Sequence, residues 1–239
     1  MNFERIILIF FIIIILLFYS NATAENPVQI NKLKVFFANL LSDNPSQDLW
    51  LSSALPVALS FKFQSFPFFK IDSFNRSISK LRQYGFSNIV TENYAVDVCK
   101  KLDVDYVIYG KYFTTGSYNS NARIDVKIII ASRVSSNVAE FTASAFCSDI
   151  SLLLGKICGF INVKIGKPKY QPYFITGVSG NMRSFPVLIE AINNLQNDNL
   201  YQAIESAKKA LNENTGYFDM AVRVIYLSYE RLVSRMPRY

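Results

Sequence analysis

The sequence feature that most constrains the fold is a change in the spacing of apolar residues late in the chain. Up to residue 166, stretches typical of strands alternate with stretches typical of helices, whereas from Phe185 onward apolar residues recur only at helical spacing. Residues 167–184 separate the two patterns and contain prolines and glycines without periodicity, which predicts a linker. We therefore expect an α/β domain at residues 30–166 and an all-helical tail at residues 185–239.

The α/β region is predicted to form a mixed sheet with flanking helices. Ile124, Val126 and Ile128 alternate with charged residues, which predicts a half-buried strand within an antiparallel meander. Pro56 lies inside the first predicted helix and suggests a kink or a late helix start. The predicted strands cover 33–39, 68–71, 105–112, 123–130 and 138–146. Of the four predicted helices, the first begins near Trp50, the second ends near Gly85, the third covers 92–102 and the fourth begins at Asp149.

The tail is predicted to contain three helices, separated by turns at 197–199 and 212–216. The fold class that follows is α/β with a C-terminal all-α helical hairpin region. The apolar stripes of the helices consist of Leu188, Ala191, Ile192 and Leu195, then Tyr201, Ala203, Ile204, Ala207, Ala210 and Leu211, and finally Phe218, Ala221, Val222, Ile225, Tyr229 and Leu232.

Residues 1–24 have the three parts of a cleavable signal peptide. A short charged start precedes an apolar run from Ile6 to Phe18, and the small pair Ala22 and Ala24 follows. We expect cleavage between Ala24 and Glu25, hence a periplasmic or extracellular location. The alternative is a retained membrane anchor, but the run is shorter than the roughly 20 residues of a spanning helix. No cysteine follows the apolar run, so lipid attachment is not expected, and no later segment is expected to span a membrane.

The net charge of +7 favours anionic partners through general attraction. For an exported protein these would be an anionic cell-wall polymer, a lipid surface or an acidic protein, and the alternative is a solvated basic surface. Nucleic acid is not expected, because the basic residues are scattered along the chain rather than clustered.

The chain has no histidine, which argues against enzymes that use Ser-His or Cys-His pairs and against nearly all catalytic zinc sites. No cofactor, metal or catalytic residue is therefore predicted. The Asp103-x-Asp105 pair lacks the later ligands of a calcium loop and is read as a turn. Five acids are interpreted as helix caps or helix-dipole partners, namely Asp43, Asp48, Asp72, Glu92 and Asp149.

The three cysteines are Cys99, Cys147 and Cys158. Export permits disulfides, but the number is odd and no C-x-x-C spacing occurs. A pair between Cys147 and Cys158 is one possibility, and three buried thiols on apolar stripes are the other.

Two segments and one helix are candidates for partner binding. Phe63 and Phe66 belong to a cluster of aromatic residues around Pro67, which is either core-filling or an exposed patch for a protein. On the tail, Tyr201 and Ala207 are candidate partner contacts, and an open groove along Ala203, Ala207 and Ala210 would favour protein recognition. A basic and aromatic segment in the linker, which could also be plain linker, supplies Lys167, Lys169, Tyr170 and Tyr173.

Residues 30–166 resemble the amino-terminal domain family of TolB, which includes CsgG-type and LpoB-like envelope domains. The most specific stretch is LDVDYVIYG at residues 102–110, and the strand KVFFAN at 34–39 and FKIDS at 69–73 fit as well. The resemblance implies an envelope assembly or regulatory component, in which an aspartate pair makes the turn and Gly110 permits a bulge or a close approach. The chain departs from the family in lacking a lipobox, the CsgG membrane hairpins and the TolB propeller.

The tail resembles a tetratricopeptide repeat through Ala191, residues 200–204 and residues 210–211. Only about one and a half repeats fit, and such repeats need neighbours to bury their faces. We therefore expect the tail to dock on the α/β domain or on another chain.

The leading hypothesis is a non-enzymatic envelope adaptor or assembly factor that recognises a partner protein. The alternatives are a binder of a small ligand or cell-wall glycan between sheet and tail, and an enzyme that uses carboxylates.

Overall fold

The computed structural model describes residues 31–43, 49–115, 122–166, 184–213 and 218–236. From Lys32 onward they belong to one compact unit. Residues 167–183 of the predicted linker and the whole predicted signal peptide lie outside the described residues, and so do Lys167, Lys169, Tyr170, Tyr173, Ala24 and Glu25.

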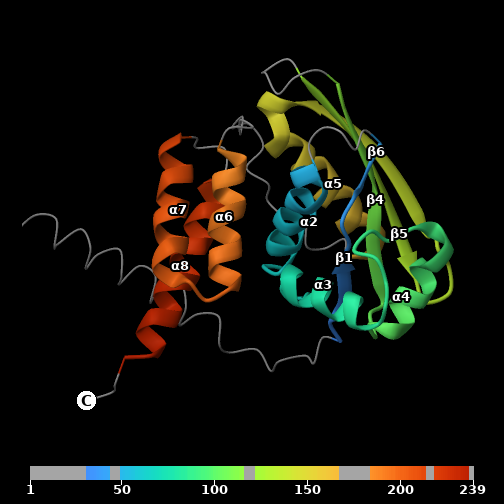
Figure 1. Cartoon of the computed structure of the whole chain (residues 1–239), viewed down its shortest axis with the longest axis horizontal. Helices are drawn as coiled ribbons and strands as arrows, with labels where there is room; N and C mark the ends of the chain where they lie inside the picture. The colour runs from blue at the N-terminus through green and yellow to red at the C-terminus, as the bar shows by residue number, and fades with distance from the viewer. Residues whose placement is uncertain (1–30, 44–48, 116–121, 167–183, 214–217, 237–239) are drawn as a thin grey trace, which may run out of the picture. The chain divides into compact units, whose positions relative to one another are not determined.

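The α/β domain is built on a mixed sheet in the order β3-β1-β4-β5-β6, with the short β2 also beside β4. Figure 1 labels β1, β4, β5 and β6. The first three neighbours pair in parallel, and β4, β5 and β6 form the antiparallel meander that the alternating sequence predicts. The strands are β1 (Leu33–Phe37), β2 (Leu41–Ser42), β3 (Phe69–Lys70), β4 (Tyr106–Thr115), β5 (Arg123–Ser132) and β6 (Ala139–Phe146). The predicted fold class is confirmed.

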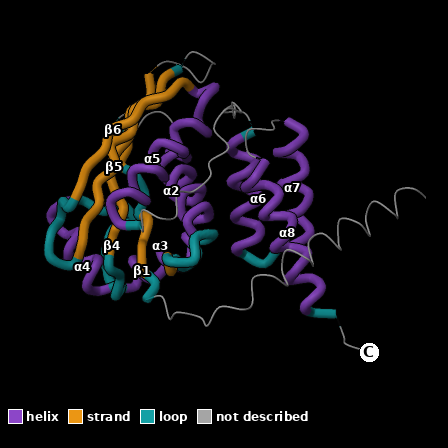
Figure 2. Tube along the Cα trace, turned by 180° about the vertical axis from the view of Figure 1, so that it is seen from behind, coloured by secondary structure: helices purple, strands orange, loops and turns teal. Residues whose placement is uncertain are grey.

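Helices cover the two faces of the sheet unequally. On one face, α2 (Leu49–Phe63) and α5 (Ile150–Ile165) bury the core side of the strands, and Figure 2 shows both on the same side. The fully buried Ile124, Val126 and Ile128 of β5 point to this side. On the other face, α4 (Ala95–Lys101) contacts β4 and β5. Two single-turn helices, η1 (Glu92–Tyr94) and η2 (Cys147–Asp149), precede α4 and α5, and α3 (Phe74–Gln83) contacts β1.

Pro56 lies within α2 and does not delay its start, which corrects the expectation of a late beginning. A proline at this position cannot donate to the carbonyl four residues earlier, that of Ser52. This carbonyl accepts a hydrogen bond from the Leu40 N–H at 3.0 Å, while the Ser52 hydroxyl donates to the Leu40 carbonyl at 2.5 Å. The proline thus makes available a helix carbonyl that holds the chain after β1.

Gly110 fulfils the expected close approach. It lies in β4 opposite Ile128, and a Cβ at this position would stand 1.9 Å from the Lys127 carbonyl oxygen. No larger residue fits without moving β5 away.

The tail consists of α6 (Phe185–Gln196), α7 (Leu200–Glu213) and α8 (Phe218–Ser234), which pack on one another. It docks on α2, as predicted for helices that cannot bury their faces alone. The Trp50 and Phe185 rings lie 6.0 Å apart, and Lys62 forms an ion pair with Asp219 of α8. Arg223 donates to the Phe61 carbonyl at 2.6 Å and stacks over the Phe61 ring at 4.7 Å.

Candidate interaction surfaces

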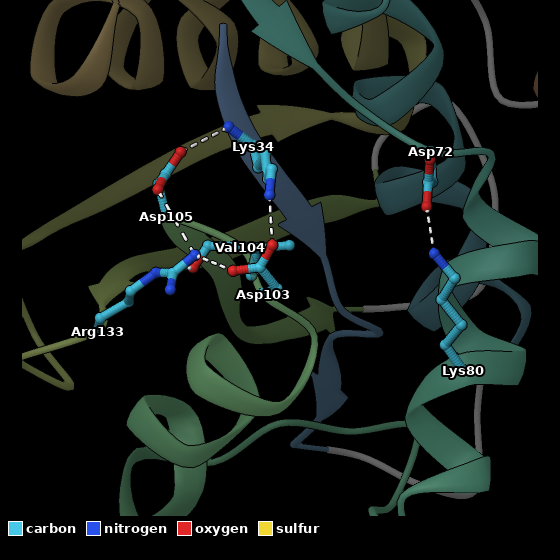
Figure 3. A network of polar contacts seen from close by, with 7 residues as sticks. All are labelled: Lys34, Asp72, Lys80, Asp103, Val104, Asp105 and Arg133. Atoms are coloured by element: carbon cyan, nitrogen blue, oxygen red, sulfur yellow. Dashed lines mark hydrogen bonds and ion pairs between the residues drawn. The ribbon is translucent and has the colours of Figure 1, made fainter. Parts of the chain in front are cut away.

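The densest polar network surrounds the predicted aspartate turn between α4 and β4 (Figure 3). Asp103 has a left-handed φ of 53°, and the next N–H, that of Val104, returns to the Cys99 carbonyl and closes the end of α4. Asp103 forms ion pairs with Lys34 of β1 and, at 2.7 Å, with Arg133 after β5. Asp105 accepts the Lys34 backbone N–H at 2.8 Å.

These charges neutralise one another. The two cations, through hydrogen bonds and charge, lower the pKa of Asp103 to about 2, and the same contacts raise that of Arg133. Arg133 also donates to the Val104 carbonyl at 3.0 Å and lies 3.9 Å from the Asp105 carboxylate, so its guanidinium has three partners. An acid with a depressed pKa and two bound cations is a poor general acid or base, and the network holds strands in place rather than performing chemistry.

The interpretation of five acids as helix caps or helix-dipole partners holds by position for Glu92, in the first turn of η1, and for Asp149. Asp149 occupies the N-cap of α5 but makes no side-chain capping bond. Asp72 pairs with Lys80 at 2.7 Å, which lowers its pKa, and Asp43 pairs with Lys111 at 2.8 Å. Ion pairing competes with capping because the lysines lie within reach of the same oxygens. Asp48 lies outside the described residues.

The described residues contain no group of three or more His, Cys, Asp or Glu side chains that could hold a metal ion. All three cysteines are buried and none of them forms a disulfide, so the alternative of a Cys147–Cys158 disulfide is not realised. Burial raises the pKa of Cys99 to about 11 and that of Cys158 to about 12. Neither thiol is placed to act as a nucleophile.

The aromatic cluster is core rather than an exposed patch. Phe63 is fully buried, with its ring 5.5 Å from Phe37 and 5.1 Å from Phe69. Phe66 is half-buried and stacks edge-on against Phe63 at 5.3 Å. This corrects the assignment of Phe63 as a partner contact, because its neighbours on β1, on β3 and in the turn after α2 enclose the ring.

The predicted groove on α7 is closed. Ala203, Ala207 and Ala210 are all completely buried, since α6 and α8 pack against α7. Ala207 is therefore a packing residue, which corrects its assignment as a partner contact. Tyr201 is 72% exposed and remains a predicted contact.

The sequence reading missed an apolar stripe on α8. Val222, Tyr226, Tyr229 and Val233 are 39%, 51%, 50% and 62% exposed and follow one another at spacings of four, three and four residues. The sequence pattern groups Val222 and Tyr229 with Ala221 in one apolar stripe. Instead Ala221, Val224 and Ser228 face inward, and the Ser228 hydroxyl is satisfied by the Val224 carbonyl at 2.8 Å. Because α8 carries apolar residues on two sides, periodicity alone could not choose between them.

No helix in the part of the chain that the structure describes has both the length and the hydropathy for a membrane crossing.

Comparison with known proteins gives structural matches only. No protein-family model matches the sequence, and no curated protein does. The chain is similar to the LpoB C-terminal domain from Salmonella enterica, with 14% identity and a TM-score of 0.33 over 53% of this chain and 91% of that one. For the same domain from Escherichia coli the identity is 14% and the TM-score 0.33, over 53% of this chain and 90% of that one. For lipoprotein GNA1162 from Neisseria meningitidis the identity is 16% and the TM-score 0.38, over 56% of this chain and 97% of that one.

An LpoB domain, one of the relatives named by the motif resemblance, is thus among the structures to which this chain is similar. At these TM-scores the matches carry no argument about function. The likenesses to TolB, to CsgG and to a tetratricopeptide repeat remain predictions.

Proposed function

We propose that the protein is a non-enzymatic adaptor of the cell envelope that acts in the periplasm or outside the cell. The exposed stripe of α8 carries this proposal. Its four apolar residues lie on a helix, and their spacing is that of a coiled-coil seam. A helix of a partner protein fits such a surface, because it buries the stripe without rearranging the tail.

Two further observations support the adaptor reading. Residues 1–24 have the composition of an export signal, so the partner is sought in the envelope. The acids of the densest charge network are occupied by cations, which leaves the α4–β4 turn without a free acid or base. The binding of a small ligand or cell-wall glycan stays a prediction, and none of the described contacts favours it.

The test is capture of cross-linked partners from an envelope extract by the full chain and by two matched variants. Tyr229→Ser removes an aromatic ring from the α8 stripe, and Tyr84→Ser removes one from the far end of α3, where the tyrosine is 54% exposed. We expect Tyr84→Ser to capture the same proteins as the unaltered chain and Tyr229→Ser to lose them. Identical capture by both variants would show that the tail does not bind the partner. An unaltered chain that captures no protein would overturn the adaptor function.

A further inference from the structure

Strand β6 forms an open edge of the sheet. The strand order ends at β6, and no described element pairs with its outer side (Figure 2). The Cys147 N–H donates to the Ala122 carbonyl at 2.8 Å. The backbone N–H and carbonyl groups of the odd-numbered residues of this strand therefore face β5, and those of the even-numbered residues face away from it. The backbone N–H and carbonyl groups of Glu140, Thr142 and Ser144 therefore point outward.

This edge lacks the usual protection against pairing with another strand. Natural edge strands carry lysine, proline or a bulge, or are very short. By contrast, β6 spans Ala139–Phe146 without lysine or proline, and its only charge, Glu140, is paired with Lys127 at 2.8 Å. One lysine of α5, Lys156, reaches a single edge carbonyl, that of Ser144, at 3.5 Å.

Exposed apolar side chains surround the edge. Val138 and Phe146 stand at the two ends of β6, 48% and 53% exposed. Along α5, Leu152 and Val163 are 45% and 70% exposed and lie on the outer surface of the helix that packs on β6. A strand that pairs with β6 alone would leave this part of α5 uncovered, whereas a second sheet with its own helix would cover it.

The sequence of β6 is complementary to itself in one antiparallel register. A two-fold axis at Ala143 places Thr142 opposite Ser144 of a second copy and Glu140 opposite Phe146, so no like charges meet. On the core side, Phe141 falls opposite Ala145, which pairs a large side chain with a small one. The smallest contact, between the two Ala143 residues, lies on the axis.

The same axis brings the two α5 helices together. Phe160 stacks on Phe141 at 4.8 Å and Lys156 reaches Ser144, so the middle of α5 lies over Ala143. Rotation about the axis then sets Leu152 near Val163 of the second copy. The same two-fold rotation gives the outward backbone groups of β6 hydrogen-bond partners and pairs exposed apolar residues on the helices.

We propose that the β6 edge is a self-association surface, at which two copies of this chain join their sheets antiparallel about Ala143. Two copies then form one continuous sheet with α5 beside α5. This inference concerns a surface other than the α8 stripe, so its failure leaves the adaptor function intact.

The first experiment measures the mass of the full chain in solution over a dilution series. Thr142→Pro removes an N–H that faces the open edge and that β5 does not use, so the monomer fold tolerates it. Thr142→Val is the matched control, because it keeps the N–H and the branched shape. We expect a concentration-dependent dimer for the unaltered chain and for Thr142→Val, and a monomer with unchanged circular dichroism for Thr142→Pro.

The second experiment tests the register. Thr142→Cys and Ser144→Cys are made as separate proteins, mixed and oxidised. Hydrogen-bonded antiparallel pairs hold their Cα atoms about 5.5 Å apart, within the range of a disulfide. The mixture is expected to cross-link and each protein alone is not. A monomeric unaltered chain, an unchanged dimer in Thr142→Pro, or equal cross-linking of the single proteins would each overturn the proposal.

Discussion

Helices α4 and α6 end in the same way, and the comparison separates the α/β domain from the tail. Each has an aspartate in the left-handed conformation just after its last turn, Asp103 with φ 53° and Asp198 with φ 67°, where α3 has Gly85. In all three, the next N–H returns to a carbonyl five residues earlier. Glycine is the usual residue here because it has no Cβ, and aspartate is one of the few alternatives.

The two aspartates differ in the parts of the chain that they connect. Asp103 binds Lys34 of β1 and Arg133 after β5, which are far apart in the sequence and belong to the two strands on either side of β4. Asp198 binds Arg231 and Arg235, both from α8 of the same tail. The same turn therefore ties the α/β domain together across the sheet but only joins neighbouring helices in the tail.

The largest predicted effect comes from breaking the sheet itself. Gly110→Ala places a methyl group against the Lys127 carbonyl and forces β4 and β5 apart, so we expect a loss of about 3 kcal/mol or more in the free energy of unfolding. Denaturant unfolding followed by circular dichroism measures this loss. Gly155→Ala in α5 is the control, since nothing lies within 4 Å of its Cβ. It should be neutral or slightly stabilising, and an equally damaging Gly155→Ala would refute the explanation by close approach.

A smaller effect is expected at the contact between tail and α/β domain. Arg223→Met removes the bond to the Phe61 carbonyl and the stacking on the Phe61 ring, and we expect a loss of about 2 kcal/mol. Because the tail then keeps only part of its polar attachment, with the Lys62–Asp219 ion pair still in place, calorimetry should separate one unfolding transition into two. Arg235→Met, which removes an exposed pair with Asp198, should keep the single transition. Two transitions in Arg235→Met as well would show that the separation does not come from the docking contact.

The smallest effect compares the two aspartates directly through pH. The cations lower the pKa of Asp103 to about 2, below the unfolded value of about 3.9. Its contribution to stability is therefore complete above the unfolded pKa and is lost as the pH falls through the folded value. Asp103→Asn should flatten the decline in the denaturant midpoint between about pH 4 and pH 2.

Asp198→Asn is the partner measurement. Its pKa is lowered by Arg235 and Arg231, so the sign is the same, and the flattening should be weaker because only α8 is held. Both effects should shrink in high salt, since both side chains are exposed. A pH profile that is unchanged in Asp103→Asn would mean that the network does not contribute to folding.

Much of the fold follows from local patterns. The alternation in β5 is predictable because Ile124, Val126 and Ile128 face the core while charged residues face out. The close approach at Gly110 is also predictable, because few roles in a strand require glycine. The tail helices are predictable as helices from their spacing alone.

What could not be predicted depends on partners distant in sequence. Arg133 joins the aspartate turn only because β5 brings it beside β4, and nothing near it in the sequence indicates this. The role of Pro56 depends on Leu40, which uses the freed carbonyl of Ser52. The exposed side of α8 depends on where α6 and α7 lie, so the apolar spacing alone does not separate the exposed Val222 and Tyr229 from the buried Ala221.

Two buried thiols, those of Cys99 and Cys158, report how fast two parts of the molecule open. Cys99 lies in α4 of the α/β domain and Cys158 lies in α5, and burial raises the pKa of both thiols. A thiol reagent can reach either one only when the surrounding structure opens. The labelling rate of Cys158 therefore measures the opening of α5 beside the tail contact, and the labelling rate of Cys99 measures the opening between α4 and the sheet.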